Sequence, residues 1–169
     1  GDEAEKLALI SRKLDQAAVL LMDIQSRFLF ETRFYARRQR GFVPVEELND
    51  LMVEAQKEAF GNALAVYHPH FWASKLHFYR TSTPFYNFPY TFGYLFSAGV
   101  YAQALDRGPA FEEAYINLLR DTGRMRVEDL ARKHLGFDLT RPEFWQQAID
   151  IVTADLDEFM LLSARELGS

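Results

Sequence analysis

The stretch that decides the fold spans residues 7–28 and reads LALISRKLDQAAVLLMDIQSRF. Its apolar residues recur at alternating intervals of three and four, the spacing of one stripe on an amphipathic α-helix. The stripe consists of Leu7, Ile10, Leu14, Ala17, Leu21, Ile24 and Phe28. Tyr35 continues it, and Gly41 is expected to end the helix. The chain therefore opens with one long helix whose apolar face needs partners.

Helical spacing recurs over nearly all of the remaining chain. The expected helices run from Pro44 to Gly61, over about 70–79, from Tyr90 to Leu105, from Pro109 to Gly123, over 127–135, and from a Thr140-x-x-Glu143 capping box through Leu162. A loop is expected after 70–79, and the Tyr90–Leu105 helix is expected to be buried. In the Pro109–Gly123 helix, the residues expected to face inward are Phe111, Tyr115, Leu118 and Leu119. A strand is the alternative for Tyr90–Leu105, but this run is long and rich in Ala and Gly. We predict an all-α protein in which residues 1–169 form one compact unit.

The length and composition are those of one globular domain. The chain has 169 residues, of which 49% are hydrophobic and 25% are charged. Its net charge of −5 argues against nucleic-acid binding, which usually requires a basic face. It has no cysteine, which excludes disulfides and a thiolate metal site and is typical of cytoplasmic proteins. Because no apolar run reaches about 18 residues, we expect no membrane-spanning helix.

Residues 77–93, which read HFYRTSTPFYNFPYTFG, are dense in aromatic rings and punctuated by Pro and Gly. Tyr86, Tyr90 and Tyr94 are four residues apart, so any helical part of the segment places neighbours on one face. The pattern alone favours a buried aromatic stripe. The alternative is a row of hydroxyl groups that donate hydrogen bonds to a peptide backbone or to a tetrahedral oxyanion. The density of phenols, the adjacent prolines and His77 add weight to this second interpretation, and both interpretations stay open from the sequence.

The histidines do not by themselves predict a metal site. His68, His70 and His77 lie close together in the sequence, but tetrahedral zinc needs three or four converging ligands, and no HExxH motif is present. His134 falls in the last turn of an expected helix, where a surface imidazole complements the helix dipole. We therefore expect that this chain alone binds no metal.

An ordered series of segments resembles the oligoendopeptidase F family of zinc metallopeptidases, which is thimet oligopeptidase-like, across almost the whole chain. The segments read LDQA (14–17), RFLFE (27–31), FY (34–35), EELN (46–49), YHPHFW (67–72), HFY (77–79), FYNFPYTFGY (85–94), YINLL (115–119) followed by Gly123, and HLGFDL (134–139).

This resemblance implies an all-α, zincin-type metallopeptidase with a deep channel between two halves and a preference for oligopeptides. In the family, two His of an HExxH helix and a Glu of a following helix hold zinc, and the HExxH glutamate activates the metal-bound water. Both ligand helices lie upstream of the matched region. The chain therefore resembles the C-terminal portion of the catalytic domain, which lacks the zinc helix and closes the channel opposite the metal.

In that portion, the family uses one histidine and several tyrosines to contact the substrate and the carbonyl oxyanion. His77 matches the histidine. Tyr86 and Tyr90 match two tyrosines of the pattern Phe-Tyr-x-Tyr-x-Tyr-x-x-Gly, Gly93 matches its glycine, and Phe88 replaces the middle tyrosine. The resemblance implies that His77 and Tyr90 are catalytic. It also implies that both bind substrate together with Tyr86 and Gly93.

The expected function is that of the C-terminal part of a cytoplasmic zinc endopeptidase that hydrolyses oligopeptides. Zinc and a missing N-terminal half would complete the site, so this chain is expected to be inactive alone. The apolar face toward the missing half would favour self-association. Two alternatives are a non-catalytic helical module that binds a peptide or a partner protein, and a half enzyme that assembles with a separate HExxH chain.

Overall fold

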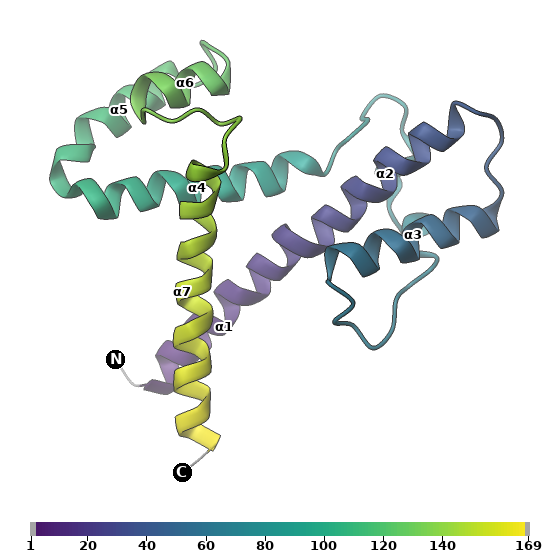
Figure 1. The fold of residues 1–169 in the computed structure, drawn as a ribbon, viewed down its shortest axis with the longest axis horizontal. Helices are drawn as coiled ribbons and strands as arrows, with labels where there is room; N and C mark the ends of the chain where they lie inside the picture. Colours follow the sequence, from purple (N-terminus) through teal and green to yellow (C-terminus); the bar gives the residue numbers. More distant parts are fainter. Residues whose placement is uncertain (1–2, 168–169) are drawn as a thin grey trace. The chain divides into compact units, whose positions relative to one another are not determined.

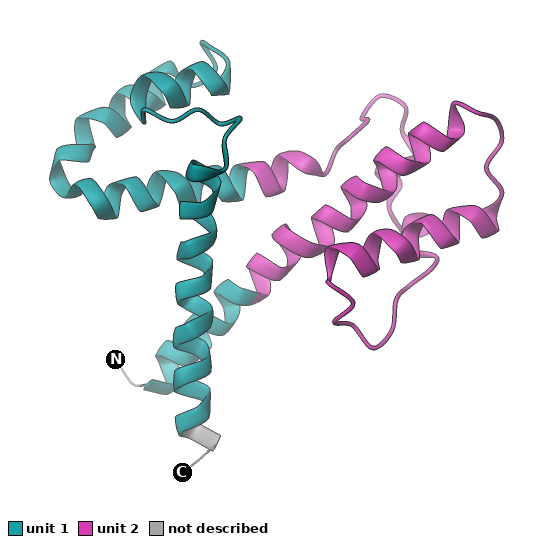
Figure 2. Ribbon diagram, viewed as in Figure 1, with its two compact units in different colours: residues 1–14, 93–169 teal, residues 15–92 magenta. Residues whose placement is uncertain are grey.

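A computed structural model describes residues 3–167, and within that range every regular element is helical, which confirms the all-α prediction (Figure 1). The chain divides into two compact units: unit 1 comprises residues 1–14 and 93–169, and unit 2 comprises residues 15–92 (Figure 2). That residues 1–169 belong to one larger peptidase domain stays a prediction. In the described range, no helix has both the length and the apolar character needed to cross a membrane.

Residues 3–38 form the predicted long helix in three successive pieces. They are α1 (Glu3–Ala18), the π-helical turn η1 (Val19–Asp23) and α2 (Ile24–Arg38). Of the predicted stripe, Ile10, Ala17 and Ile24 are fully buried. The π-helical turn was not predicted, because a single wide turn leaves the apolar spacing almost unchanged. Gly41, at a φ of 139°, follows the helix end as expected.

The core of unit 2 lies between α2 and α3 (Val45–Ala59). Helix α3 begins directly after Pro44, as the sequence predicts. Phe30 of α2 and Met52 and Ala55 of α3 are at most 2% exposed. Partly buried side chains surround them: Leu29, Phe34, Leu48, Leu51, Phe71, Trp72 and Phe78. Through Phe71, Trp72 and Phe78, this cluster supports the segment over residues 71–79, which leads into the candidate site.

Two 3-10 turns replace the short helix predicted over about 70–79. Turn η2 covers Phe71–Ser74 and turn η3 covers Leu76–Tyr79. Lys75, between them, has an extended backbone with φ −109° and ψ 103°, which interrupts the helical hydrogen bonds. The prediction of one helix was therefore wrong, although an irregular loop follows as expected.

Helix α4 (Phe88–Arg107) contains the predicted helix and begins two residues before it. It crosses α7 (Pro142–Leu167) at Gly99, where an added Cβ would lie 2.4 Å from the ring of the buried Phe144. Close approach therefore requires glycine at this position. The expectation that α4 is buried was only partly correct, because Tyr101 and Leu105 are 54% and 60% exposed.

The rest of unit 1 follows the predicted order of helices. A 3-10 turn, η4 (Gly108–Phe111), leads into α5 (Glu112–Asp121), and α6 (Val127–His134) comes next. Phe111 and Leu118 are buried as predicted. Tyr115 and Leu119 were also predicted to face inward, but they are 42% and 52% exposed. Helix α5 therefore has a wider apolar face than unit 1 covers.

The predicted capping box at the start of α7 does not form. Helix α7 begins at Pro142, two residues after Thr140. Thr140 instead donates both its hydroxyl and its backbone N–H to Oδ1 of Asp138, at 2.7 and 3.0 Å. A local Asx turn thus competes successfully for the residue that would have capped the helix.

Candidate functional site

Three of the predicted site residues come together in unit 2. His77 lies in η3, Tyr86 in the following loop and Tyr90 in the first turn of α4. The rings of His77 and Tyr86 stack with centroids 5.4 Å apart and planes at 26°. Tyr86 and Tyr90 are 47% and 46% exposed. They do not form the buried aromatic stripe that the spacing alone favours.

The two phenols form a hydrogen-bonded pair. The hydroxyl of Tyr90 donates to that of Tyr86 across 2.7 Å. This bond, more than burial, raises the pKa of Tyr90 above its ordinary value. The hydroxyl proton of Tyr86 remains available for another acceptor, and a phenol that already accepts a hydrogen bond is a stronger donor.

Asn87 connects His77 to the scaffold and is only 1% exposed. Its Nδ2 lies 2.7 Å from Nε2 of His77, and its Oδ1 lies 3.4 Å from Nη1 of Arg27. Asn87 directly precedes α4, where its side chain would normally cap the helix. Here Pro89 has no N–H, and the N–H of Tyr90 bonds to the backbone oxygen of Asn87 at 3.1 Å. The side chain is therefore free to face His77.

Arg27 is itself held in place from two sides. Its guanidinium forms an ion pair with Asp23, one helical turn earlier in the chain. The same group lies 5.2 Å from the centroid of the Phe71 ring, within the range of a cation–π contact. The side chain of Arg27 is 17% exposed, so the cation is largely shielded from solvent. Its donors therefore face Asn87 from a fixed position.

Glu31 ties the loop that carries Tyr86 to α2. It is 1% exposed, and its Oε1 accepts the backbone N–H of Phe85 at 2.7 Å. Phe85 has a φ of 54°, a left-handed conformation that costs a non-glycine residue about 1–3 kcal/mol. The bond to Glu31 helps to offset that strain. Burial, and next the nearby Glu31, raise the pKa of Tyr35, whose ring centroid lies 5.3 Å from that of Phe85.

A third attachment joins the start of α4 to the π-helical turn. The hydroxyl of Thr91 donates to the backbone oxygen of Leu20 at 2.6 Å. A π-helical turn leaves a backbone oxygen without its usual helical partner, and such turns often occur near functional sites. Leu20, Arg27 and Glu31 thus give successive attachments to the segment that contains Phe85, Asn87 and Thr91.

The surroundings of His77 favour its neutral form. Partial burial is the main cause that lowers its pKa below the ordinary value of 6.5, and the positive charges of Arg27 and Lys75 lower it further. A group that is neutral at physiological pH can both donate and accept a hydrogen bond. Its ring stacks on a phenol, so the imidazole and the phenol together form one polar surface.

The remaining positions of the family pattern lie apart from these contacts. Gly93 belongs to α4 in unit 1 and is exposed, and among the described residues nothing lies within 4 Å of a Cβ added there. No steric requirement for glycine is therefore visible at this position. Phe88, which replaces the middle tyrosine, is 48% exposed, and its ring centroid lies 6.2 Å from that of Phe28.

The described residues do not fit a zinc ion. Among the side chains described, those of residues 3–165, no three His, Cys, Asp or Glu are grouped so that they could hold a metal. The rings of His68 and His70 are 6.3 Å apart, and Nε2 of His77 is engaged by Asn87. His134 is not the surface group that was predicted, because its side chain is 9% exposed and its Nε2 lies 2.9 Å from Oδ2 of Asp121.

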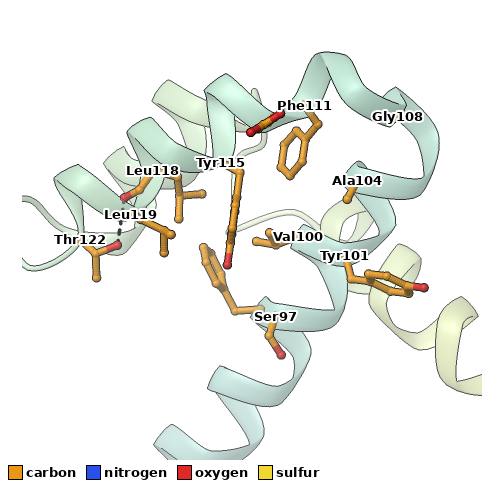
Figure 3. Close-up of a pocket in the computed structure, with 12 residues that line it drawn as sticks. Ser97, Val100, Tyr101, Ala104, Gly108, Phe111, Tyr115, Leu118, Leu119 and Thr122 are labelled. Atoms are coloured by element: carbon orange, nitrogen blue, oxygen red, sulfur yellow. Dashed lines mark hydrogen bonds between the residues drawn. The ribbon is translucent and has the colours of Figure 1, made fainter.

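Unit 1 contains a cavity of different character, with a volume of about 660 Å³, between α4 and the η4–α5 segment (Figure 3). Apolar side chains dominate its lining, among them Val100, Phe111 and Tyr115. The lining hydroxyls of Ser97 and Thr122 donate to backbone oxygens of their own helices. The cavity therefore offers shape and apolar surface more than directional hydrogen bonds.

The sequence predictions missed the residues that support the site. Asn87 stands inside the quoted 85–94 segment but was not assigned a role, because its position before a helix suggests only a cap. Arg27 and Glu31 stand in the matched RFLFE segment, four residues apart on one helix face. That spacing was the one sign in the sequence that Arg27 and Glu31 could act together. Their partners, sixty and fifty-four residues further on, could not be identified from spacing alone.

Comparisons with models of known protein families, with curated proteins and with solved structures found no match to this chain.

Proposed function

We propose that this chain is the C-terminal portion of a zinc endopeptidase that resembles oligoendopeptidase F and hydrolyses oligopeptides, and that it acts in the cytoplasm. In this proposal His77, Tyr86 and Tyr90 contact the peptide. His77 and Tyr86 donate hydrogen bonds to the carbonyl oxygen as it becomes an oxyanion, and Tyr90 strengthens that donation through its hydrogen bond to Tyr86. Gly93 contributes to peptide binding. A separate region supplies the zinc site, and the chain alone hydrolyses nothing.

The observation that carries the proposal is the convergence of His77, Tyr86 and Tyr90 in unit 2. They come from a 3-10 turn, a loop and a helix, yet their rings and hydroxyls are in direct contact. The half-exposed phenol of Tyr86, which already accepts a hydrogen bond from Tyr90, and a neutral imidazole are suitable donors for negative charge that develops in a transition state. One such donor is worth about 10²–10³-fold in kcat.

Zinc has no place among the described side chains, so we derive no step of the reaction through it. The part of this chain is limited to binding the peptide, orienting it and donating hydrogen bonds. The loop is suited to that part because Glu31 and Asn87 attach it firmly to α2 and η3. Preorganised donors need no rearrangement during the reaction, which is the source of their catalytic value.

The apolar cavity of unit 1 supports the further proposal that a missing half covers this surface. Two residues that line the cavity, Tyr101 and Leu119, are each more than half exposed. Exposed apolar surface of this kind commonly marks an interaction site. The same observation supports an alternative function, a non-catalytic helical module that binds a peptide or a partner protein. The chain alone should self-associate in either case.

Two measurements test the proposal. The coding sequence upstream of Gly1 should continue in frame into an HExxH motif and a downstream Glu. A separate neighbouring gene with HExxH would favour the half enzyme, and the absence of both would favour the binding module. Calorimetric titration of the isolated chain with zinc should show no stoichiometric site, whereas tight one-to-one binding would mean that the chain itself supplies metal ligands.

A further inference from the structure

We propose that Asn87 and Arg27 are positioning residues that hold the imidazole of His77 neutral, with its proton on Nδ1. The catalytic meaning of this arrangement rests on the proposed peptidase function, but the position of the proton does not. The inference follows from three side chains of unit 2 whose donor and acceptor groups can be assigned in order.

The first step is the orientation of the Asn87 amide. A guanidinium can only donate hydrogen bonds, so the atom of Asn87 that faces Nη1 of Arg27 at 3.4 Å must be the amide oxygen. Turning the amide over would place its NH₂ group against the guanidinium, donor against donor. Arg27 cannot easily move to relieve such a clash, because Asp23 and the ring of Phe71 hold its cation in place.

The second step is the proton of His77. With the amide oxygen on Arg27, the NH₂ group of Asn87 faces Nε2 of His77 at 2.7 Å and donates to it. An imidazole nitrogen that accepts a hydrogen bond carries no proton, so the proton of the neutral ring is on Nδ1. Asn87 is 1% exposed, which leaves little room for water to replace either bond.

The consequence concerns the chemistry that His77 can perform. Its basic nitrogen is occupied by Asn87, so Nε2 is not available as a general base. Its Nδ1–H is the group left to donate a hydrogen bond. The ring stacks on Tyr86, which also retains a hydroxyl proton for an outside acceptor. The site therefore presents an imidazole donor and a phenol donor, and the two together suit an oxygen atom that gains negative charge.

Nitrogen-15 NMR of the full 169-residue chain, labelled at histidine, tests the position of the proton directly. The spectrum of His77→Gln identifies the resonances of His77 by their loss. At neutral pH we expect Nδ1 of His77 to resonate as a protonated nitrogen and Nε2 as an unprotonated one. A proton on Nε2, or a ring protonated on both nitrogens, would overturn the proposal.

The substitution Asn87→Asp tests the role of the amide. It keeps the shape of the side chain but replaces the donating NH₂ group with an oxygen that can only accept. His77 should then carry a proton on Nε2, either as the other neutral tautomer or as the cation. An unchanged His77 spectrum in a folded variant would contradict the proposal. If this variant does not fold, the spectrum of the unsubstituted chain still decides.

The chain offers a matched control at a second Asn–His pair in the same unit. Nδ2 of Asn49 lies 3.4 Å from Nε2 of His70, and Oδ1 of Asn49 accepts the indole N–H of Trp72 at 2.9 Å. Asn49→Asp should alter the spectrum of His70 and leave that of His77 unchanged. If Asn49→Asp shifted the His77 signals as much as Asn87→Asp does, then the added negative charge alone would explain the shift, and the proposal would fail.

The outcome is separable from that of the proposed function. If a longer protein that carries this chain hydrolyses no peptide while His77 still has its proton on Nδ1, then the peptidase function fails and the positioning role of Asn87 stands. If hydrolysis is observed but the proton is on Nε2, then the positioning proposal fails. In an active longer protein, Asn87→Asp should also change the pH profile of kcat, which a purely structural role would leave unmoved.

Discussion

The two units present surfaces of opposite chemistry. In unit 2, His77, Tyr86 and Tyr90 are linked to one another, and buried polar side chains of α2 and of the residue before α4 support them. In unit 1, the cavity between α4 and α5 is lined mainly by apolar side chains, and its hydroxyls of Ser97 and Thr122 bond to their own helices. The first surface is arranged for directional hydrogen bonds, and the second for apolar contact.

The difference shows what each kind of surface requires. Directional donors are useful only when their neighbours fix them, and unit 2 achieves this with contacts from one helical stretch at Leu20, Arg27 and Glu31. An apolar cavity needs no such support, since burial of apolar area is not directional. This contrast supports the proposal that unit 2 recognises a peptide and that unit 1 mediates association.

The largest effect should come from truncating the cores beneath the two surfaces. Phe30→Ala and Phe144→Ala each remove a ring that is at most 2% exposed, so each should lower the free energy of unfolding by about 3–5 kcal/mol, measured by urea titration. Of these two residues, only Phe30 contacts the turn that contains His77, because its ring centroid lies 5.0 Å from that of Phe78. Its loss should alter the NMR signals of His77, and the loss of Phe144 should not. Equal changes in the His77 signals of the two variants would contradict the conclusion that the two units support their surfaces separately.

The next effect concerns catalysis in a longer, zinc-bearing protein. Tyr90→Phe removes the donor to Tyr86, and Tyr86→Phe removes the outward donor. Each should lower kcat by about 10²–10³-fold with a smaller change in KM, because the outward hydrogen bond of Tyr86, which Tyr90 strengthens, stabilises mainly the transition state. Tyr101→Phe, at a 54% exposed tyrosine of unit 1, is the control and should be neutral. Full activity of Tyr86→Phe and Tyr90→Phe would remove both from the site.

A moderate effect is expected on self-association through the apolar cavity. Leu119→Glu places a charge on the rim at a residue that is 52% exposed, so it should weaken self-association about tenfold or more, as judged by sedimentation equilibrium. Ile149→Glu makes the same change at a 41% exposed residue of α7 outside the cavity and should have little effect. A chain that is monomeric at high concentration would contradict the role given to unit 1.

The smallest effect is on the pH dependence of stability. The folded pKa of His77 is below 6.5, so the unfolded chain takes up this proton first, and stability is lost as the pH falls below about 6.5. His77→Gln should remove that loss, as followed by urea unfolding at pH 7.5 and 5.5. Asp121 in unit 1 has a lowered pKa because it accepts hydrogen bonds from Lys133 and His134, so its contribution is lost only below about pH 3.8. Identical slopes for wild type and variant would contradict the His77 assignment.

Much of the fold follows from apolar spacing, because a helix repeats its buried face along the chain. The long helix over residues 3–38, α3, α4 and α5 occupy the predicted stretches. The failures are local. Lys75 breaks a predicted helix with an extended backbone, and Thr140 donates to Asp138 in a local turn and does not cap α7. Both depend on competition between nearby hydrogen bonds, which spacing does not reveal.

The exposed residues of the candidate site could be predicted from the sequence, but the buried residues that hold them in place could not. His77, Tyr86 and Tyr90 could be named from the family pattern, and the structure places them in contact. Arg27 and Glu31 could not be named, because their partners lie more than fifty residues further along the chain. Asn87 could not be named, because its side chain contacts His77 and does not cap the helix that follows it. The inward orientation predicted for Leu119 failed because the apolar face of α5 is wider than its own unit covers.

The most direct test of the central claim is zinc-dependent hydrolysis of an internally quenched oligopeptide. Residues 1–169 alone and the proposed longer protein should be assayed side by side, each with and without a chelator. We predict no hydrolysis by residues 1–169, and hydrolysis by the longer protein that the chelator abolishes. Hydrolysis by residues 1–169 alone, or a zinc-loaded longer protein that cleaves no peptide, would contradict the account.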